Sequence, residues 1–60
     1  MSKPVHPPAL LVIDDEVQIR RLLRVTLESE GYRVREAETA QLGLAEAAQQ
    51  PPDGIILDLG

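Results

Sequence analysis

The sequence predicts an α/β fold in which strands and helices alternate around a small parallel sheet. Two short apolar runs, residues 10–13 and 55–57, lack polar alternation, which is typical of strands buried on both faces. Two longer segments, residues 16–30 and 40–50, carry apolar side chains at helical spacing. Because short connections join these segments, right-handed crossovers should place the strands side by side in one parallel sheet.

The first segment of the chain, residues 1–8, contains three prolines and predicts a disordered leader. Proline removes a backbone donor and cannot continue a helix or join the interior of a sheet. His6 lies in this leader, and we interpret it as part of a solvated spacer and not as a ligand or phosphorelay residue. Residues 9–13 then form the first strand, which ends at Asp14 and Asp15.

Residues 16–30 are expected to form the first helix. Asp15 is placed to cap it, with Gln18 completing a pair similar to a capping box, and Gly31 is placed to end it in the left-handed conformation. The apolar stripe expected to be buried against the sheet consists of Ile19, Leu22, Leu23, Thr26 and Leu27. The opposite face, expected to be solvated, carries charges four residues apart: Glu16, Arg20, Arg24 and Glu28.

Residues 32–37 are expected to form the second strand. Val34 stands between Arg33 and Arg35, and this alternation indicates an edge strand with one wet face. A second helix over residues 40–50 follows, with Thr39 as its candidate cap. This helix is built mainly from Ala40, Leu44, Ala45, Ala47 and Ala48, and its small alanines are expected to let it approach the sheet closely.

Residues 51–54, two prolines followed by aspartate and glycine, end the second helix, and the third strand is expected at residues 55–59. The first strand is wholly apolar and should lie in the middle, which gives the spatial order 2-1-3. This is the beginning of the flavodoxin-like, doubly wound order 2-1-3-4-5. The apolar third strand would then be a bare edge, so we expect residues 9–60 to be the N-terminal half of a larger domain.

Acidic side chains follow the first and third strands. Ligands of parallel α/β sheets bind at the carboxyl ends of the strands, where Asp14, Asp15 and Asp58 should converge. Three carboxylates in one place repel each other unless a cation or protons intervene. Because Mg²⁺ prefers oxygen ligands, the sequence predicts a magnesium site at this edge of the sheet.

The composition excludes several classes of function. The 60 residues carry a net charge of −4, which gives no electrostatic reason to bind nucleic acid or anionic lipid. The absence of cysteine excludes disulfides and thiolate metal sites, and Tyr32 is the one aromatic residue. No apolar stretch approaches the length of a membrane span or of a signal peptide core. We therefore expect a soluble, cytoplasmic unit.

Three stretches of the sequence resemble one known family. They are residues 11–16 (Leu-Val-Ile-Asp-Asp-Glu), the helix end at residues 30–32 (Glu-Gly-Tyr) and residues 52–59 (Pro-Asp-Gly-Ile-Ile-Leu-Asp-Leu). Together they resemble the first half of a response-regulator receiver domain, and the resemblance runs from about residue 9 to residue 60. It implies a flavodoxin-like fold in a protein of two-component signalling, similar to transcriptional regulators of the OmpR/PhoB type.

The resemblance also implies a role for each acid. Asp58 resembles the phosphoacceptor, which takes a phosphoryl group from a partner histidine kinase. Asp14 and Asp15 resemble the pair that holds Mg²⁺, and Gly60 matches the position whose backbone carbonyl also ligates the metal. The sequence departs from the family in having Gly54 where a bulky aliphatic residue is common. The family's later Ser or Thr, its Lys, its fourth and fifth helices and a DNA-binding domain are not among these 60 residues.

Other functions of acids at strand ends require residues that this sequence lacks. A Walker B strand would need a G-x-x-x-x-G-K-[ST] loop, which the sequence lacks. An aspartate-nucleophile hydrolase would need a second Asp two residues after the first, where Glu16 and Gly60 stand, and a dinucleotide fold needs glycines after the first strand. A structural alternative stays open: a truncated half-domain without activity that self-associates through residues 55–59, its acids being strand-end and turn residues.

Overall fold

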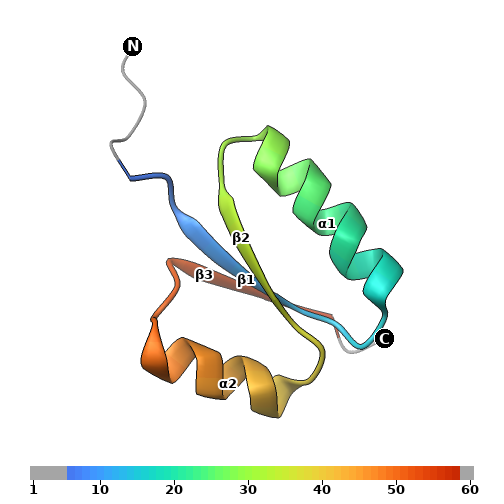
Figure 1. Cartoon of the computed structure of the whole chain (residues 1–60), viewed down its shortest axis with the longest axis vertical. Coiled ribbons are helices and arrows are strands. Elements are labelled where there is room, and N and C mark those ends of the chain that lie inside the picture. The colour runs from blue at the N-terminus through green and yellow to red at the C-terminus, as the bar shows by residue number, and fades with distance from the viewer. Residues whose placement is uncertain (1–5, 59–60) are drawn as a thin grey trace.

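A computed structural model describes residues 6–58 and contains three strands and two helices (Figure 1). In chain order they are β1 (Ala9–Ile13), α1 (Val17–Ser29), β2 (Arg33–Ala37), α2 (Ala40–Gln49) and β3 (Gly54–Leu57). All strands are parallel, in the order β2-β1-β3. The predicted α/β class and the strand order 2-1-3 are therefore confirmed.

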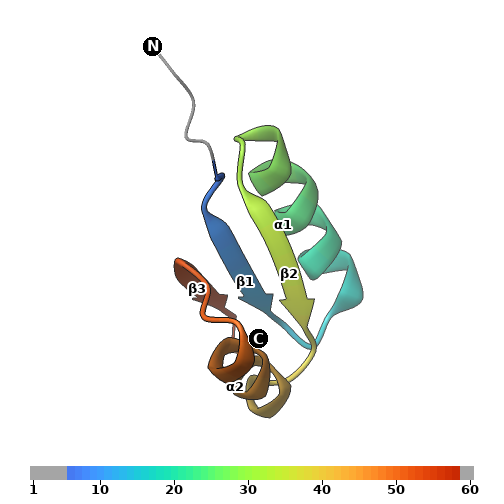
Figure 2. The same cartoon turned by 60° about the vertical axis from the view of Figure 1, so that its left-hand side comes forward.

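The two helices cover opposite faces of the sheet, and both views show it between them (Figures 1 and 2). Leu11, Ile13 and Ala37 form a buried cluster, against which Ala47 of α2 packs. Successive side chains of a strand point to opposite faces. Val12 and Val34, both buried, therefore face α1. The core thus consists of two thin layers, one on each side of β1.

The ends of the elements differ from the predicted bounds by a residue or two. The helices and β2 are shorter at their ends than residues 16–30, 40–50 and 32–37, whereas β3 begins at Gly54, one residue earlier than predicted. Residue 59 of the predicted third strand and residues 1–5 of the predicted leader lie outside the described residues. Within the leader, the carbonyls of Pro8 and Pro7 accept hydrogen bonds from the backbone N–H (2.9 Å) and Nε (3.3 Å) of Arg33.

The predicted cap of α1 is wrong. The N-cap residue is Glu16, whose side chain makes no capping hydrogen bond, so Asp15 and Gln18 form no capping box. Instead, Oδ1 of Asp14 accepts a hydrogen bond from the backbone N–H of Glu16 at 2.8 Å. The residue before Asp15 thus satisfies a donor at the entry to the helix, in the manner of an aspartate turn.

The predicted buried stripe of α1 is only partly correct. Ile19, Leu23 and Leu27 are half-buried, whereas Leu22 and Thr26 are exposed, and no residue of the helix is fully buried. A helix that lies on a narrow sheet covers it with one row of side chains, so the flanking row of the stripe stays in solvent.

The C-terminus of α1 confirms the predicted role of Gly31, whose φ is 99°. The N–H of Gly31 donates to the carbonyl of Glu28 (3.0 Å), and the N–H of Tyr32 donates to the carbonyl of Leu27 (3.1 Å). This pair of bonds is the Schellman motif, in which a left-handed residue lets the chain turn back. Gly31 therefore ends α1 and directs the chain into β2.

The N-terminus of α2 confirms the predicted Thr39 cap, because Oγ1 of Thr39 accepts a hydrogen bond from the N–H of Leu42 at 3.1 Å. The residues through which α2 approaches the sheet were only partly predicted, because Ala47 packs against the buried cluster as expected but Gly43 was not selected. Gly43 is the buried residue of this helix, and a Cβ built there would lie 2.7 Å from Cγ1 of Ile13. Leu44 is 65% exposed. A glycine, more than the alanines, thus permits the contact.

The two edge strands differ from expectation in their exposure. β2 is an edge strand as predicted, but Val34 and Ala37 are buried on opposite faces of it, so it has no single wet face. β3 was expected to be buried on both faces, yet Ile55 and Leu57 are 48% and 50% exposed. They pair with Leu11 and Ile13 and so lie on the α2 face, beyond the part of the sheet that α2 covers. In the described part of the chain neither helix is long and apolar enough to cross a membrane.

Candidate acidic site at the carboxyl edge of the sheet

The structure brings the three predicted acids to one edge of the sheet. Asp14 follows β1 and Asp58 follows β3, and these strands pair in register so that Ile13 stands opposite Leu57. The N–H of Asp58 donates to the carbonyl of Ile13 at 3.0 Å, which continues the ladder to the edge. A hollow of about 220 Å³ opens there, called the acidic hollow below. It is lined by Ile13, Asp14, Asp15, Glu38, Thr39, Ala40, Leu57 and Asp58.

Asp14 is the buried member of this set, with 3% of its surface exposed. Its Oδ1 is occupied by the N–H of Glu16, whereas its Oδ2 is buried without a hydrogen-bond partner among residues 6–58. A buried carboxylate oxygen without a partner is costly, and native proteins normally supply a donor or a cation for such an atom. Asp14 thus has the chemistry expected of a residue that holds a hard cation.

Asp15 and Asp58 are exposed, and so is a third acid that sequence reasoning did not select, Glu38. Glu38 follows β2 directly, as Asp14 follows β1, so an acid directly after a predicted strand was the signal that could have identified it. No arginine or lysine is among the residues that line the acidic hollow in the described part of the chain. The charged side chains that line the hollow are therefore all acidic, which favours cations.

Arg20 was expected on a solvated face, and the structure corrects this. Its side chain is only 14% exposed and lies between α1 and β2. Nη1 donates to the backbone carbonyl of Asp14 at 2.7 Å, and Nε donates to Oε1 of Glu36 at 3.0 Å. The pattern of charges four residues apart does give one pair within the helix, Arg24 with Glu28 at 3.4 Å. Arg20 itself connects the helix to the acidic site.

The structure does not assemble the predicted metal ligands into a formed site. Among residues 6–58, no group of three His, Cys, Asp or Glu side chains meets the geometry of a metal centre. Asp14, Asp15 and Asp58 do share the acidic hollow. Gly60, the predicted carbonyl ligand, lies outside the described residues. The ligand set stays a prediction.

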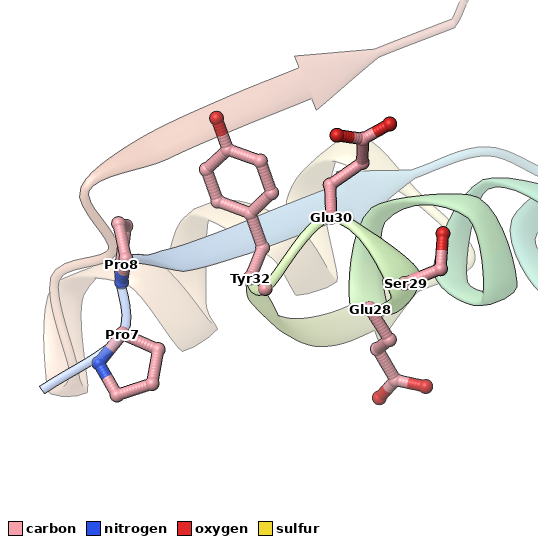
Figure 3. A pocket seen from close by; sticks show the side chains of 7 residues that line it. Pro7, Pro8, Glu28, Ser29, Glu30 and Tyr32 are labelled. Carbon is pink, nitrogen blue, oxygen red and sulfur yellow. The ribbon is translucent and has the colours of Figure 1, made fainter. Parts of the chain in front are cut away.

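A larger hollow, of about 480 Å³, lies at the opposite, amino end of the strands. Tyr32, Pro7 and Pro8 line it together with the last turn of α1 (Figure 3). The carboxylates of Glu28 and Glu30 point in different directions in this view, so no set of polar groups converges on a ligand. The acidic hollow is therefore the better candidate for a functional site.

Comparison with known proteins identifies the family of the chain. Residues 10–60 match the family described as response regulator receiver domain. The chain is 61% identical over 51 residues to the KDP operon transcriptional regulatory protein KdpE of Escherichia coli, covering 85% of this chain and 23% of that protein. It is 55% identical over 51 residues to the transcriptional regulatory protein KdpE of Mycobacterium tuberculosis, with the same two coverages.

A more distant match is the phosphate regulon transcriptional regulatory protein PhoB of Pseudomonas aeruginosa, at 43% identity over 49 residues, or 82% of this chain and 21% of that protein. The chain thus spans less than a quarter of the length of these relatives. Residues 36–39 (Glu-Ala-Glu-Thr) with Gly43, Leu44 and residues 58–60 (Asp-Leu-Gly) resemble KdpE, the regulator of Kdp potassium transport. The two KdpE matches confirm that resemblance.

Proposed function

This chain belongs to the response regulator receiver domain family, and we propose that Asp58 is the residue that accepts a phosphoryl group from a sensor histidine kinase. The observation that carries the proposal is the position of Asp58, directly after β3 and beside Asp14 in the acidic hollow. Its side chain is exposed, so a kinase can reach it. The relatives are transcriptional regulators by name, and we propose the same role for the whole protein.

In the proposed step a carboxylate oxygen of Asp58 attacks the phosphorus of a phosphohistidine. The new P–O bond forms as the P–N bond breaks, and the imidazole nitrogen leaves with the electron pair. A carboxylate and a phosphoryl group repel each other, and Mg²⁺ supplies the positive charge that offsets this repulsion. Asp14 and Asp15 would hold the ion, with Gly60 as a further ligand, while Asp14 keeps its Oδ1 bond to Glu16.

Asp58 is itself the group that is modified, so we propose a signalling module and not an enzyme with an external substrate. The hydroxyl and lysine that the family carries on later strands are not among these 60 residues. We therefore propose that the residues of the acidic hollow bind Mg²⁺ and that phosphoryl transfer to Asp58 is slower without this hydroxyl and lysine.

The first test is a ¹⁵N–¹H NMR spectrum of the protein titrated with Mg²⁺. We expect dispersed peaks, with shifts confined to Asp14, Asp15, Asp58 and their chain neighbours. The second is phosphorylation by a small acyl phosphate with Mg²⁺, read by intact mass and compared with Asp58→Asn, which should stay unmodified. A spectrum indifferent to Mg²⁺ would reject the metal site, and equal modification of Asp58→Asn would reject Asp58 as acceptor.

The exposed edge favours a second proposal, self-association through β3. Ile55 and Leu57 are half exposed on a strand that forms the edge of the described sheet, and its outward backbone groups can pair with another strand. A two-fold dimer would place two copies of β3 against each other. Sedimentation at several concentrations should show a rising mass that Ile55→Lys abolishes. A folded protein whose monomer mass does not change with concentration would contradict this proposal.

A further inference from the structure

We propose that Arg20 is a positioning residue of the acidic hollow, holding the backbone of Asp14 so that its carboxylate is presented in one fixed geometry. The inference rests on the proposed function of the hollow as a cation site. It concerns a helix residue that does not line the hollow and whose contacts join three elements of the fold.

The contacts of Arg20 are those of a clamp. Its Nη1 donates to the carbonyl of Asp14 at 2.7 Å and its Nε to Oε1 of Glu36 at 3.0 Å. One planar guanidinium donates both bonds. It therefore fixes the position of Glu36 on β2 relative to the carbonyl of Asp14 after β1. Both charged side chains are largely buried, at 14% and 19% exposure, which strengthens the interaction.

The clamp completes the restraint of Asp14. The N–H of Asp14 donates to the carbonyl of Ala37 at 3.1 Å, and Oδ1 accepts from the N–H of Glu16 at 2.8 Å. With Arg20 on the carbonyl, Oδ2 is the one polar atom of Asp14 that has no partner in the described part of the chain. The Arg20 bond is the only one of these three that a side chain donates, so substitution can remove it while Asp14 and the backbone bonds remain.

Arg24 offers a matched control one turn further along α1. Its Nη1 donates to Oε2 of the same Glu36 at 2.6 Å, and its Nη2 donates to a backbone carbonyl, that of Val34, at 3.2 Å. Arg24 therefore makes the same kinds of bond from the same helix, and it differs chiefly in its carbonyl partner, which is Val34 instead of Asp14. It is also more exposed, at 44%. Loss of Arg24 should affect the packing of α1 on β2 without changing the position of Asp14 in the acidic hollow.

The experiment compares Arg20→Met, Arg20→Lys and Arg24→Met with the unmodified protein. Mg²⁺ affinity is measured from the amide shifts of Asp14 and Asp58, and the hydrogen exchange of the Asp14 N–H is measured in EDTA. We expect Arg20→Met to weaken Mg²⁺ binding about tenfold, the scale seen when a residue that orients a metal ligand is lost. Exchange at Asp14 should also accelerate, whereas Arg24→Met should leave both quantities near their original values.

Arg20→Lys keeps the charge and the aliphatic stem. If Arg20→Met does not fold, Arg20→Lys is the variant compared with the unmodified protein. A lysine ammonium lacks the planar fork, and we expect the affinity to fall with it too. Full Mg²⁺ affinity in Arg20→Lys, or equal losses in Arg20→Met and Arg24→Met, would overturn the positioning role. If the unmodified protein shows no response to Mg²⁺, the proposed cation site itself fails. If it responds and Arg20→Met responds equally, only the role of Arg20 fails.

Discussion

Replacing Asp14 by Asn should stabilise the metal-free protein and remove its response to Mg²⁺. Asp14 is 3% exposed, and its Oδ2 is buried without a partner among residues 6–58. The side chain also stands beside Asp15, Glu38 and Asp58 in a hollow that no described arginine or lysine lines. Asparagine keeps an oxygen that can accept the N–H of Glu16 and removes the buried charge.

The expected change in the free energy of unfolding follows from these contacts. The bond to Glu16, worth about 1 kcal/mol, is kept, and the amide NH₂ that replaces Oδ2 still lacks a partner. The gain therefore comes from removing the charge and its repulsion by the neighbouring acids, which we put at about 1 kcal/mol in the free energy of unfolding. Saturating Mg²⁺, at about 100 times its Kd, should add about 2.7 kcal/mol to the unmodified protein and almost nothing to Asp14→Asn.

The assay is urea unfolding followed by circular dichroism, once in EDTA and once with excess Mg²⁺. We expect the order of stability to reverse between the two conditions, with Asp14→Asn more stable in EDTA and less stable with Mg²⁺. Asp14→Ala is the control for the retained hydrogen bond. Its gain in the free energy of unfolding in EDTA should be smaller, because it leaves the N–H of Glu16 unpaired. Lower stability of Asp14→Asn in EDTA, or an undiminished Mg²⁺ response, would refute the reasoning.

Three further changes test the ends and the packing of the two helices, each by its urea midpoint. Thr39→Ala removes the cap of α2 and should lower the free energy of unfolding by about 1 kcal/mol, whereas Thr39→Ser should restore most of it. Gly43→Ala places a Cβ 2.7 Å from Cγ1 of Ile13, and the overpacking cost of about 2 kcal/mol should exceed the helix-propensity gain of about 1 kcal/mol; a net gain would mean that α2 shifts freely. Gly31→Ala has free space but a φ of 99°, so it should cost about 1 kcal/mol, and Gly31→Asn less; an unchanged midpoint for Gly31→Ala would contradict a left-handed helix end.

The features that sequence predicted correctly are those decided by a few neighbouring residues. The Thr39 cap and the Gly31 helix end depend on bonds within three to five residues, so local patterns identify them. The central place of β1 follows from its apolar composition, and two of its residues, Leu11 and Val12, are fully buried. That placement of β1 and β3 brings Asp14 and Asp58 together, which is why the acidic edge could be predicted without coordinates.

The features that sequence missed depend on contacts between elements. Arg20 and Arg24 have the spacing of a solvated face, yet both reach Glu36, which lies 16 and 12 residues further along the chain. Asp15 is of a residue type that often caps helices, but Asp14 is better placed to accept the hydrogen bond from the N–H of Glu16. The apolar pattern of Ile55 and Leu57 indicates side chains that favour burial, whereas their exposure depends on what lies over the α2 face of β3.

The strand order gives the two principal acids different environments, and this difference suits their proposed roles. Asp14 follows the central strand, so the neighbouring strands and α1 bury it, and three of its polar atoms are held by fixed partners. Asp58 follows β3, at the edge of the sheet that the structure describes, and is exposed. A cation ligand benefits from rigidity and low solvent access, whereas a phosphoacceptor has to be reached by the phosphohistidine of another protein. Exchanging the two environments would hide the nucleophile and loosen the ligand, so the burial of Asp14 and the exposure of Asp58 favour Asp58, and not Asp14, as the acceptor.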